Sequence, residues 1–316
     1  CISSAASDVY KRQELIFVDD ASTDEDATWN MLQEFERAYP ESIMILKLEE
    51  NMRQGGARNV ALQYATGEYI AFVDADDFVS ENFLLETYEK AKESDADIIQ
   101  FEYFYYTDRL GAVDSGRNIT PEVIEISSVS DRKRFLISEK VTYGCWNKLY
   151  RHTLLNEAHT AYAEHVIYEE PLFVYPLLYF ANKIVILNDA YYYYRQNDSG
   201  TMRNDMRQEE TLKMHADVQL AVWNFMKKTP FFKEYYDEIK LYFLHTYLYE
   251  TLYFAKLRDF KPSYAFYKEL EKTVITEVPD YEESTYSALI PKQMELYRMI
   301  GEGMTEEKFK EYWERL

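Results

Sequence analysis

Patterns typical of buried strands and amphipathic helices alternate along residues 14–101, and this alternation limits the fold more than any other feature of the chain. The first strand is predicted from a short run rich in apolar and β-branched side chains. Trp29, Leu32 and Phe35 then recur at helical spacing. Strands and helices that alternate with short connections are typical of a doubly wound, mostly parallel α/β sheet. Strands are predicted at 14–18, 43–48, 67–72 and 97–101, and helices at 25–38, 57–65 and 81–93.

Carboxylates follow two of these strands at their carboxyl ends, where ligands of such sheets bind. Asp19 and Asp20 end the first strand, and Asp74, Asp76 and Asp77 follow the third. If the backbone stays extended, Asp74 and Asp76 point to one side and Asp77 to the other. Two like charges on one side of a strand repel each other, which favours a divalent cation with oxygen ligands. A solvated acidic turn is the alternative.

The pattern becomes irregular after the fourth strand and then almost entirely helical. Residues 103–128 mix aromatic and polar side chains and predict either an antiparallel excursion or a long loop. The acidic pair at 169–170 begins an apolar helix. We therefore expect two domains, residues 1–204 with the sheet and residues 205–316 as an α-helical C-terminal region. Breaks between the C-terminal helices are expected near Pro262, Pro279 and Gly301.

Acidic residues outnumber basic ones and give the 316-residue chain a formal net charge of −21. This charge argues against nucleic acid as a partner and against electrostatic docking on anionic lipid. The two cysteines, Cys1 and Cys145, provide no disulfide framework and suit a reducing compartment. From the apolar pattern we expect neither a membrane span nor a signal peptide. The 30 tyrosines suit half-wet grooves, including sugar-binding ones.

Several short motifs follow one another in a fixed order. They are FVDDASTD at 17–24, GARN at 56–59, ATGEYIAFVDADD at 65–77, WNKLY at 146–150, the pair at 169–170, and YYYR at 192–195 followed by Ser199. In this order they resemble the motifs of family 2 glycosyltransferases, with Ala21 where glycine is usual. The resemblance covers about residues 10–205, and the ordered set is far more specific than any single motif.

The resemblance implies a GT-A fold and a metal-dependent, inverting enzyme. Such an enzyme transfers a sugar from a nucleotide diphosphate sugar, here expected to be a UDP-sugar, to an acceptor hydroxyl. A divalent metal, Mn²⁺ or Mg²⁺, stabilises the charge of the leaving diphosphate. The resemblance makes Asp76 the first metal ligand. It assigns Asp74 to the ribose hydroxyls or to the metal.

The same resemblance predicts the residues that hold the nucleotide. Asp19 or Asp20 accepts hydrogen bonds from the base, since a carboxylate suits an imide N–H, and Ser22 lies in the same turn. Arg58 follows the glycine loop and suits the base or the diphosphate, and Arg195 is expected to reach the diphosphate. Two alternatives remain open: Asp20 and Ser22 cap the next helix, and Arg58 is a surface helix residue.

Displacement at the anomeric carbon needs a base that takes the proton of the acceptor hydroxyl. The resemblance gives this role to Glu170, where aspartate is usual, with Glu169 before it. Both glutamates alternatively serve only to favour the helix N-terminus electrostatically. Trp146 is expected either to stack on a sugar of the acceptor or to be a core tryptophan.

One departure from the family concerns the start of the chain. The family normally opens with an apolar strand that ends in a Pro-x-Tyr-Asn turn, and nothing similar precedes Glu14. We therefore expect the first strand to be missing, which would leave open edges on its two neighbours. An inactive fragment or pseudoenzyme with a binding or assembly role is the rival hypothesis. A nucleotidyltransferase on a related sheet is a weaker one.

The predicted biology is the synthesis of a surface or extracellular polysaccharide. We expect a cytoplasmic enzyme whose acceptor is a saccharide or is lipid-linked. The apolar stretch at 241–249 is too short to span a bilayer and too apolar to stay solvated on all sides. We therefore expect the helical region to select the acceptor or to dock on a membrane complex at the inner face, through apolar or protein-mediated contacts.

Overall fold

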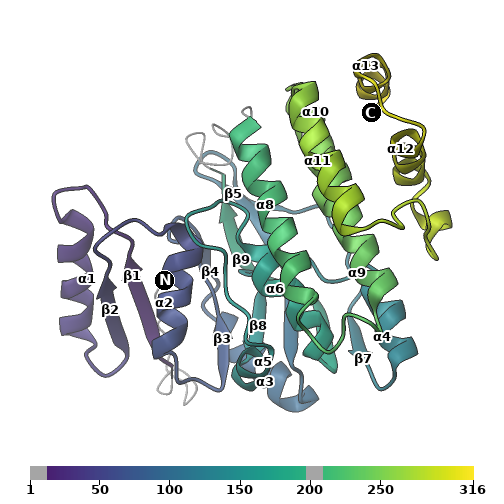
Figure 1. The fold of residues 1–316 in the computed structure, drawn as a ribbon. Helices are drawn as coiled ribbons and strands as arrows, with labels where there is room; N and C mark the ends of the chain where they lie inside the picture. The colour runs from purple at the N-terminus through teal and green to yellow at the C-terminus, as the bar shows by residue number, and fades with distance from the viewer. Residues whose placement is uncertain (1–12, 197–208) are drawn as a thin grey trace. The chain divides into compact units, whose positions relative to one another are not determined.

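The computed structural model describes residues 13–196 and 209–316 (Figure 1). The chain divides into two compact units, residues 1–198 and residues 199–316. Among the described residues, every strand belongs to the first unit, while the second is built from helices. Three expectations fall outside the described residues: the domain boundary between 204 and 205, Cys1 and Ser199.

Two parallel strands form a small sheet in the first unit. β1 (Leu15–Asp19) pairs with β2 (Ile43–Lys47), and α1 (Ala27–Ala38) is the crossover that parallel pairing requires. Within the described residues, β1 has no partner on its other edge. The same is true of one edge of β3 (Tyr69–Ala71), the end strand of a second sheet.

The second sheet of this unit has seven strands, most of which are labelled in Figure 1. Besides β3, its strands are β4 (Phe78–Val79), β5 (Ile98–Thr107), β6 (Gly111–Asp114), β7 (Glu122–Glu125), β8 (Lys148–Arg151) and β9 (Lys183–Arg195). The order is β3-β8-β5-β9-β4, with β6 added to β5 and β7 to β9. β5 and β9 run parallel, and the other described pairs are antiparallel. The predicted α/β class is confirmed, and the sheet is mixed: β6 and β8 return beside β5 in the opposite direction, whereas β9 runs parallel to it.

The stretch at 103–128 is an antiparallel excursion and not a long loop. β5 continues to Thr107 and turns back into β6. Gly111 lies at this turn with a φ of 70°, a left-handed conformation that favours glycine. The aromatic and β-branched residues of β5 explain why it stays a strand beyond residue 101.

The first unit has five further described helices: α2 (Arg53–Tyr64), which contacts β1, α3 (Phe83–Ser94), α4 (Val129–Leu136), α5 (His152–Ala158) and α6 (Glu170–Phe180). α2 begins four residues earlier than predicted, because Gly55 and Gly56 are helical. α3 begins two residues later than predicted, with Asn82 at its N-cap position. The acidic pair at 169–170 begins the apolar helix α6, as predicted.

The core of the sheet is apolar and aromatic. Ile99, Phe101 and Tyr192 are fully buried, and Phe83 of α3 packs edge-on against Phe101 with ring centroids 5.2 Å apart. Burial of this kind contributes about 1.5–3 kcal/mol for each large side chain, so β5 and β9 are held by packing as well as by pairing.

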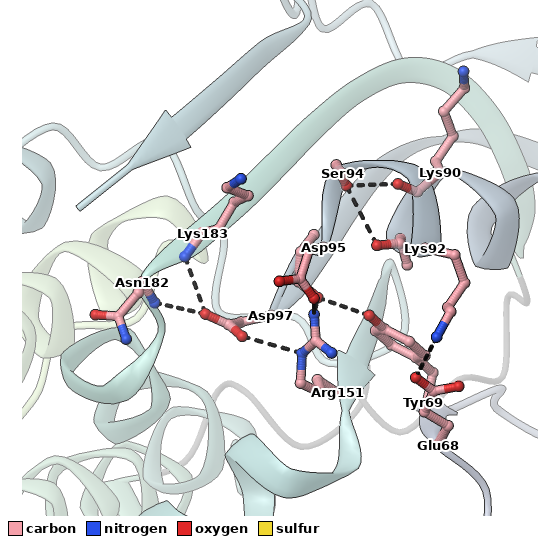
Figure 2. A network of polar contacts seen from close by, with 12 residues as sticks. Glu68, Tyr69, Lys90, Lys92, Ser94, Asp95, Asp97, Arg151, Asn182 and Lys183 are labelled. Atoms are coloured by element: carbon pink, nitrogen blue, oxygen red, sulfur yellow. Dashed lines mark hydrogen bonds and ion pairs between the residues drawn. The ribbon is translucent and has the colours of Figure 1, made fainter. Parts of the chain in front are cut away.

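A polar network fixes the starts of β5 and β9 against the end of β8 (Figure 2). The carboxylate of Asp97 accepts hydrogen bonds from Arg151 Nε at 3.2 Å, Asn182 N at 2.7 Å and Lys183 N at 3.0 Å. Arg151 also pairs with Asp95 at 2.5 Å. Because one carboxylate satisfies donors from two other segments, it sets the register of all three strands.

The second unit consists of helices joined by short links. Its elements are α8 (Glu209–Met226), α9 (Tyr236–Phe243), the π-helical segment η2 (Leu244–Glu250), α10 (Thr251–Leu257), α11 (Tyr264–Glu277), the 3₁₀ turn η3 (Ser287–Leu289), α12 (Pro291–Gly301) and α13 (Glu306–Arg315). The predicted breaks at Pro262, Pro279 and Gly301 are confirmed. Among the residues described, no helix is both long and apolar enough to cross a membrane.

Candidate active site

The aspartates after β3 lie in a turn. β3 ends at Ala71, and Asp77 N donates to the carbonyl oxygen of Asp74 at 3.1 Å. The prediction that Asp74 and Asp76 share one side assumed an extended backbone, and that assumption is wrong. Asp76 is exposed in this turn.

Asp77 ties this turn to β9. Its carboxylate accepts hydrogen bonds from Tyr192 Oη at 2.6 Å and from Arg195 N at 2.7 Å. Asp74 N donates to the same tyrosine oxygen at 3.1 Å. Tyr192 therefore holds both ends of the turn, a role that the sequence analysis did not assign to it.

Arg58 of α2 joins two acidic motifs that are far apart in the sequence. Its Nη2 lies 2.5 Å from Asp74 Oδ1, and its Nη1 lies 2.5 Å from Glu169 Oε1. The side chains of Arg58 and Glu169 are 12% and 6% exposed, so this is not a surface helix residue. Burial on its own disfavours the cation, but the acidic groups around it raise the pKa of Arg58 further above its ordinary value.

A close approach of α2 to the segment before α6 makes this pairing possible. A Cβ at Gly55 would lie 2.1 Å from the carbonyl oxygen of Ala163, so only glycine fits there. Asn59, one turn further along α2, accepts from Tyr162 N at 2.8 Å and donates to Tyr162 O at 3.0 Å. The ring of Tyr162 lies under the Arg58 guanidinium at 5.3 Å. Gly55 and Gly56, which the sequence analysis assigned to a loop, therefore lie in α2, and Gly55 lets this helix pack closely against Ala163.

The two glutamates at the start of α6 have different surroundings. Glu169 is held by Arg58. Glu170 instead accepts a hydrogen bond from Cys145 N at 2.7 Å. Burial raises the pKa of Glu170, although this hydrogen bond and Arg58 oppose the shift. Glu170 is thus a half-buried carboxyl group with no ion pair recorded among the described residues, which suits proton transfer better than the paired Glu169.

The acidic pair after β1 shapes the backbone of two neighbouring loops. Asp19 is buried and accepts from Ser22 N at 2.9 Å. Asp20 Oδ1 accepts from Met52 N at 2.7 Å, in the link that precedes α2. Asp24, not Asp20 or Ser22, accepts from Thr28 at the start of α1. The alternative in which Asp20 and Ser22 cap this helix is wrong.

Trp146 belongs to an aromatic cluster. It is half-buried and stacks on Tyr194 with centroids 5.4 Å apart, and its centroid lies 4.8 Å from that of Tyr103. Arg195 lies elsewhere: its guanidinium is over the ring of Tyr106 at 5.5 Å, and its Nη1 is 3.9 Å from Asp108. The structure therefore does not bring Arg195 to Arg58 and Glu169.

Lys148 is a buried charge that the sequence reading did not assign. Its Nζ donates to Gly144 O at 2.5 Å, Asn147 Oδ1 at 2.8 Å and Thr142 Oγ1 at 3.0 Å. It thereby fixes the loop that presents Cys145 N to Glu170. Burial lowers the pKa of Lys148 to about 7, against the charge of Glu170. A lysine inside the WNKLY motif at 146–150 was the signal available.

The carboxylates in the turn after β3 decide what kind of divalent metal site this chain can form. In the described parts of the chain, no three His, Cys, Asp or Glu side chains gather to hold a metal by themselves. Mg²⁺ ordinarily uses one or two carboxylates and takes its remaining oxygens from water and substrate phosphates. Asp76 and Asp74 are the carboxylates of the turn available for this, and Asp74 is also paired with Arg58. The residues therefore fit a metal that is shared with a diphosphate, and not one in a protein-only cage.

Comparison with solved structures defines the class of protein. The crystal structure of Staphylococcus aureus TarS 1-349 in complex with UDP aligns over 95% of this chain and 80% of that chain, with a TM-score of 0.62 and 20% identity. A structure of the same protein in complex with UDP-GlcNAc aligns over 90% of this chain and 82% of that chain, at a TM-score of 0.54 and 19% identity. The chain therefore has the GT-A fold.

The family follows from the sequence comparisons. The profile of Glycosyl transferase family 2 matches residues 1–158, and the chain belongs to this family. Glycosyltransferase GlyG of Streptococcus pneumoniae is 30% identical over 222 residues, which are 65% of this chain and 68% of that protein. The poly(ribitol-phosphate) beta-glucosyltransferase of Bacillus spizizenii is 27% identical over 61% of this chain, which spans only 29% of that protein. The enzyme is thus a glycosyltransferase.

Proposed function

We propose that this glycosyltransferase moves a sugar from a UDP-sugar to an acceptor hydroxyl, with inversion and with a divalent metal. The observation that carries the proposal is the position of Arg58 between Asp74 and Glu169. It brings the turn after β3 and the start of α6 to one cation. Transfer by direct displacement needs the anionic donor and a carboxylate base close together, and the two segments joined by Arg58 carry the residues proposed to bind the donor and to act as the base.

On the donor side, Asp76 is the proposed metal ligand, and Asp74 binds the ribose hydroxyls or assists. The metal, when bound, offsets the charge that develops on the diphosphate as the glycosidic bond breaks. Arg58 contributes a second, fixed positive charge. Either Asp19 or Asp20 accepts hydrogen bonds from the base. Asp19 is buried and accepts from Ser22 N, and Asp20 accepts from Met52 N.

On the acceptor side, we assign the base to Glu170. Its carboxylate takes the proton of the acceptor hydroxyl, whose oxygen forms a bond to the anomeric carbon. The bond from that carbon to the diphosphate oxygen breaks, and the nucleotide diphosphate leaves with the electron pair. Glu169 is less suited, because its ion pair with Arg58 makes protonation costly. Trp146 is proposed to stack on an acceptor sugar.

The biological setting is proposed from the relatives. They include enzymes named for poly(ribitol-phosphate) glycosylation and a putative glycosyltransferase EpsH of Bacillus subtilis. A role in surface polysaccharide synthesis at the cytoplasmic face of a membrane is consistent with these names. The second unit exposes large apolar side chains, among them Leu257 and Leu289, which suit contact with a partner protein or a lipid-linked acceptor.

The test is transfer from a panel of radiolabelled UDP-sugars in the presence of Mn²⁺, with the anomeric configuration of the product read by NMR. We expect one donor to give an inverted product and EDTA to abolish transfer. A product that retains the donor's configuration would exclude Glu170 as the base of a direct displacement. Full activity in EDTA would exclude the metal role of Asp76.

A further inference from the structure

Tyr192 of β9 is fully buried, and its hydroxyl lies against the acidic turn that follows β3. The hydroxyl donates to Asp77 Oδ2 at 2.6 Å and accepts from Asp74 N at 3.1 Å. One tyrosine thereby contacts the beginning and the end of the turn, and Asp76, the proposed metal ligand, lies between these two contacts in the chain. No step of the proposed transfer uses Tyr192 itself, so these contacts need another explanation.

Packing fixes the direction of this hydroxyl. Tyr192 pairs with Val79 of β4 on one side and with Tyr103 of β5 on the other, so its backbone is held by two neighbouring strands. The ring of Trp146 lies against it, with ring centroids 4.7 Å apart. A side chain that is already confined by packing loses little further conformational entropy when its polar end makes a hydrogen bond. The hydroxyl is therefore a fixed anchor for the turn.

β9 holds the end of the turn a second time, and α2 holds its beginning. Arg195 N donates to Asp77 Oδ1 at 2.7 Å, so both oxygens of this carboxylate accept hydrogen bonds from β9. At the beginning of the turn, Arg58 Nη2 lies 2.5 Å from Asp74 Oδ1. The internal hydrogen bond of the turn, from Asp77 N to Asp74 O at 3.1 Å, closes the turn but does not fix its position relative to the sheet. That position is set by the bonds to β9 and α2.

The position of the turn matters for a metal that is shared with a diphosphate. Such a metal takes only one or two carboxylates from the protein, so few protein ligands hold it in place. Carboxylates on a fixed backbone need not be ordered on binding, which reduces the entropic cost of that step. A purely structural role for Tyr192 is the alternative. It predicts a loss of stability without a specific loss of nucleotide binding.

We propose that Tyr192 is a positioning residue for the donor site, whose hydroxyl holds the turn from Asp74 to Asp77 in the conformation that binds the metal and the nucleotide diphosphate. The inference rests on the proposed function, because it takes Asp74 and Asp76 as the carboxylates of the donor site. It adds to that function a residue of β9 that acts on donor affinity through the turn, without touching the donor.

Tyr192→Phe is the direct test, because it removes the hydroxyl and keeps the ring. In the full chain without ligand, NMR should show the Asp74 amide exchanging with solvent about threefold to tenfold faster, because its acceptor is gone. Calorimetry should show an affinity for UDP in the presence of Mn²⁺ that is about threefold to tenfold weaker. The matched control is Tyr236→Phe in the second unit, which removes a tyrosine–aspartate hydrogen bond of the same length, 2.6 Å to Asp280 Oδ1. This control should leave both readouts unchanged.

A double-mutant cycle with Asp77→Asn isolates the hydrogen bond between Tyr192 and Asp77. Asp77→Asn also removes a charge close to the proposed metal ligand, but this direct effect is the same with and without the tyrosine hydroxyl. We therefore expect Asp77→Asn to weaken UDP binding more in the wild type than in the Tyr192→Phe background. Because an amide oxygen is a weaker acceptor than a carboxylate, Asp77→Asn alone should also speed exchange of the Asp74 amide. This second variant keeps the proposal testable where Tyr192→Phe fails to fold.

Three results would overturn the proposal: unchanged UDP affinity in Tyr192→Phe, an equal loss of affinity in Tyr236→Phe, or additive effects in the cycle. Sugar transfer is measured on the same proteins to separate this inference from the proposed function. If the wild type binds UDP but transfers no sugar, while Tyr192→Phe weakens that binding, the proposed transfer fails and the role of Tyr192 stands. If transfer is normal and both tyrosine variants bind UDP as the wild type does, the role of Tyr192 fails and the proposed function stands.

Discussion

The ion pairs of Arg58 allow a quantitative prediction. In Arg58→Met, the side chain keeps a similar length, but Glu169, only 6% exposed, and Asp74, 22% exposed, lose their shared cation. Removing one partner of a buried pair costs about 3–5 kcal/mol, because the charge that remains is uncompensated. We expect the free energy of unfolding to fall by about 3 kcal/mol, the lower end of this range, since Asp74 keeps some contact with water.

The origin of this loss is tested by a second substitution. Glu169→Gln in the Arg58→Met background removes the stranded charge, so the double variant should be more stable than Arg58→Met alone by about 1–2 kcal/mol. The assay is urea unfolding followed by tyrosine fluorescence. Arg134→Met is the matched control, because the pair of Arg134 with Asp131 is exposed, and its urea midpoint should not change measurably.

Two results would refute the reasoning. If Arg58→Met unfolds at the wild-type urea concentration, the pair is not a buried cation site. If the two substitutions are additive, the loss arises from packing and not from the stranded carboxylate of Glu169.

Three further predictions concern the chemistry and the buried charge. Asp76→Asn should abolish transfer and weaken Mn²⁺-dependent UDP binding without unfolding the chain; equal calorimetric affinity in both proteins would remove Asp76 from the site. Glu170→Gln should lower turnover by about two to four orders of magnitude with donor binding little changed, while Glu157→Gln, an exposed control on α5, should have no effect. A normal rate for Glu170→Gln would move the role to Glu169. In the folded chain the pKa of Lys148 is about 7, below its ordinary value of 10.5, so the unfolded chain binds more protons between these values and stability should rise with pH. From pH 6.5 to 8.5 the wild type should gain about 2 kcal/mol relative to Lys148→Met in urea unfolding, and a constant difference would contradict the pKa shift.

Local patterns in the sequence determined much of the first unit. Periodicity located β1, β2, α1 and α6 to within one or two residues, since each buries one face and shows it in its spacing. The ordered motifs led to the family before any contact was known. The start of α2 was misplaced because glycine usually marks a loop, whereas Gly55 is small so that Ala163 can approach the helix.

The pairing of distant groups was decided only by the tertiary structure. Arg58 and Glu169 are separated by 111 positions, and no local pattern states that α2 passes the start of α6. The same holds for Tyr192, which reaches back to the turn at Asp77, and for the different surroundings of Glu169 and Glu170. Residue type and spacing determine which groups are available. Burial and partners, which set the charge and the pKa of each group, exist only once remote segments pack together.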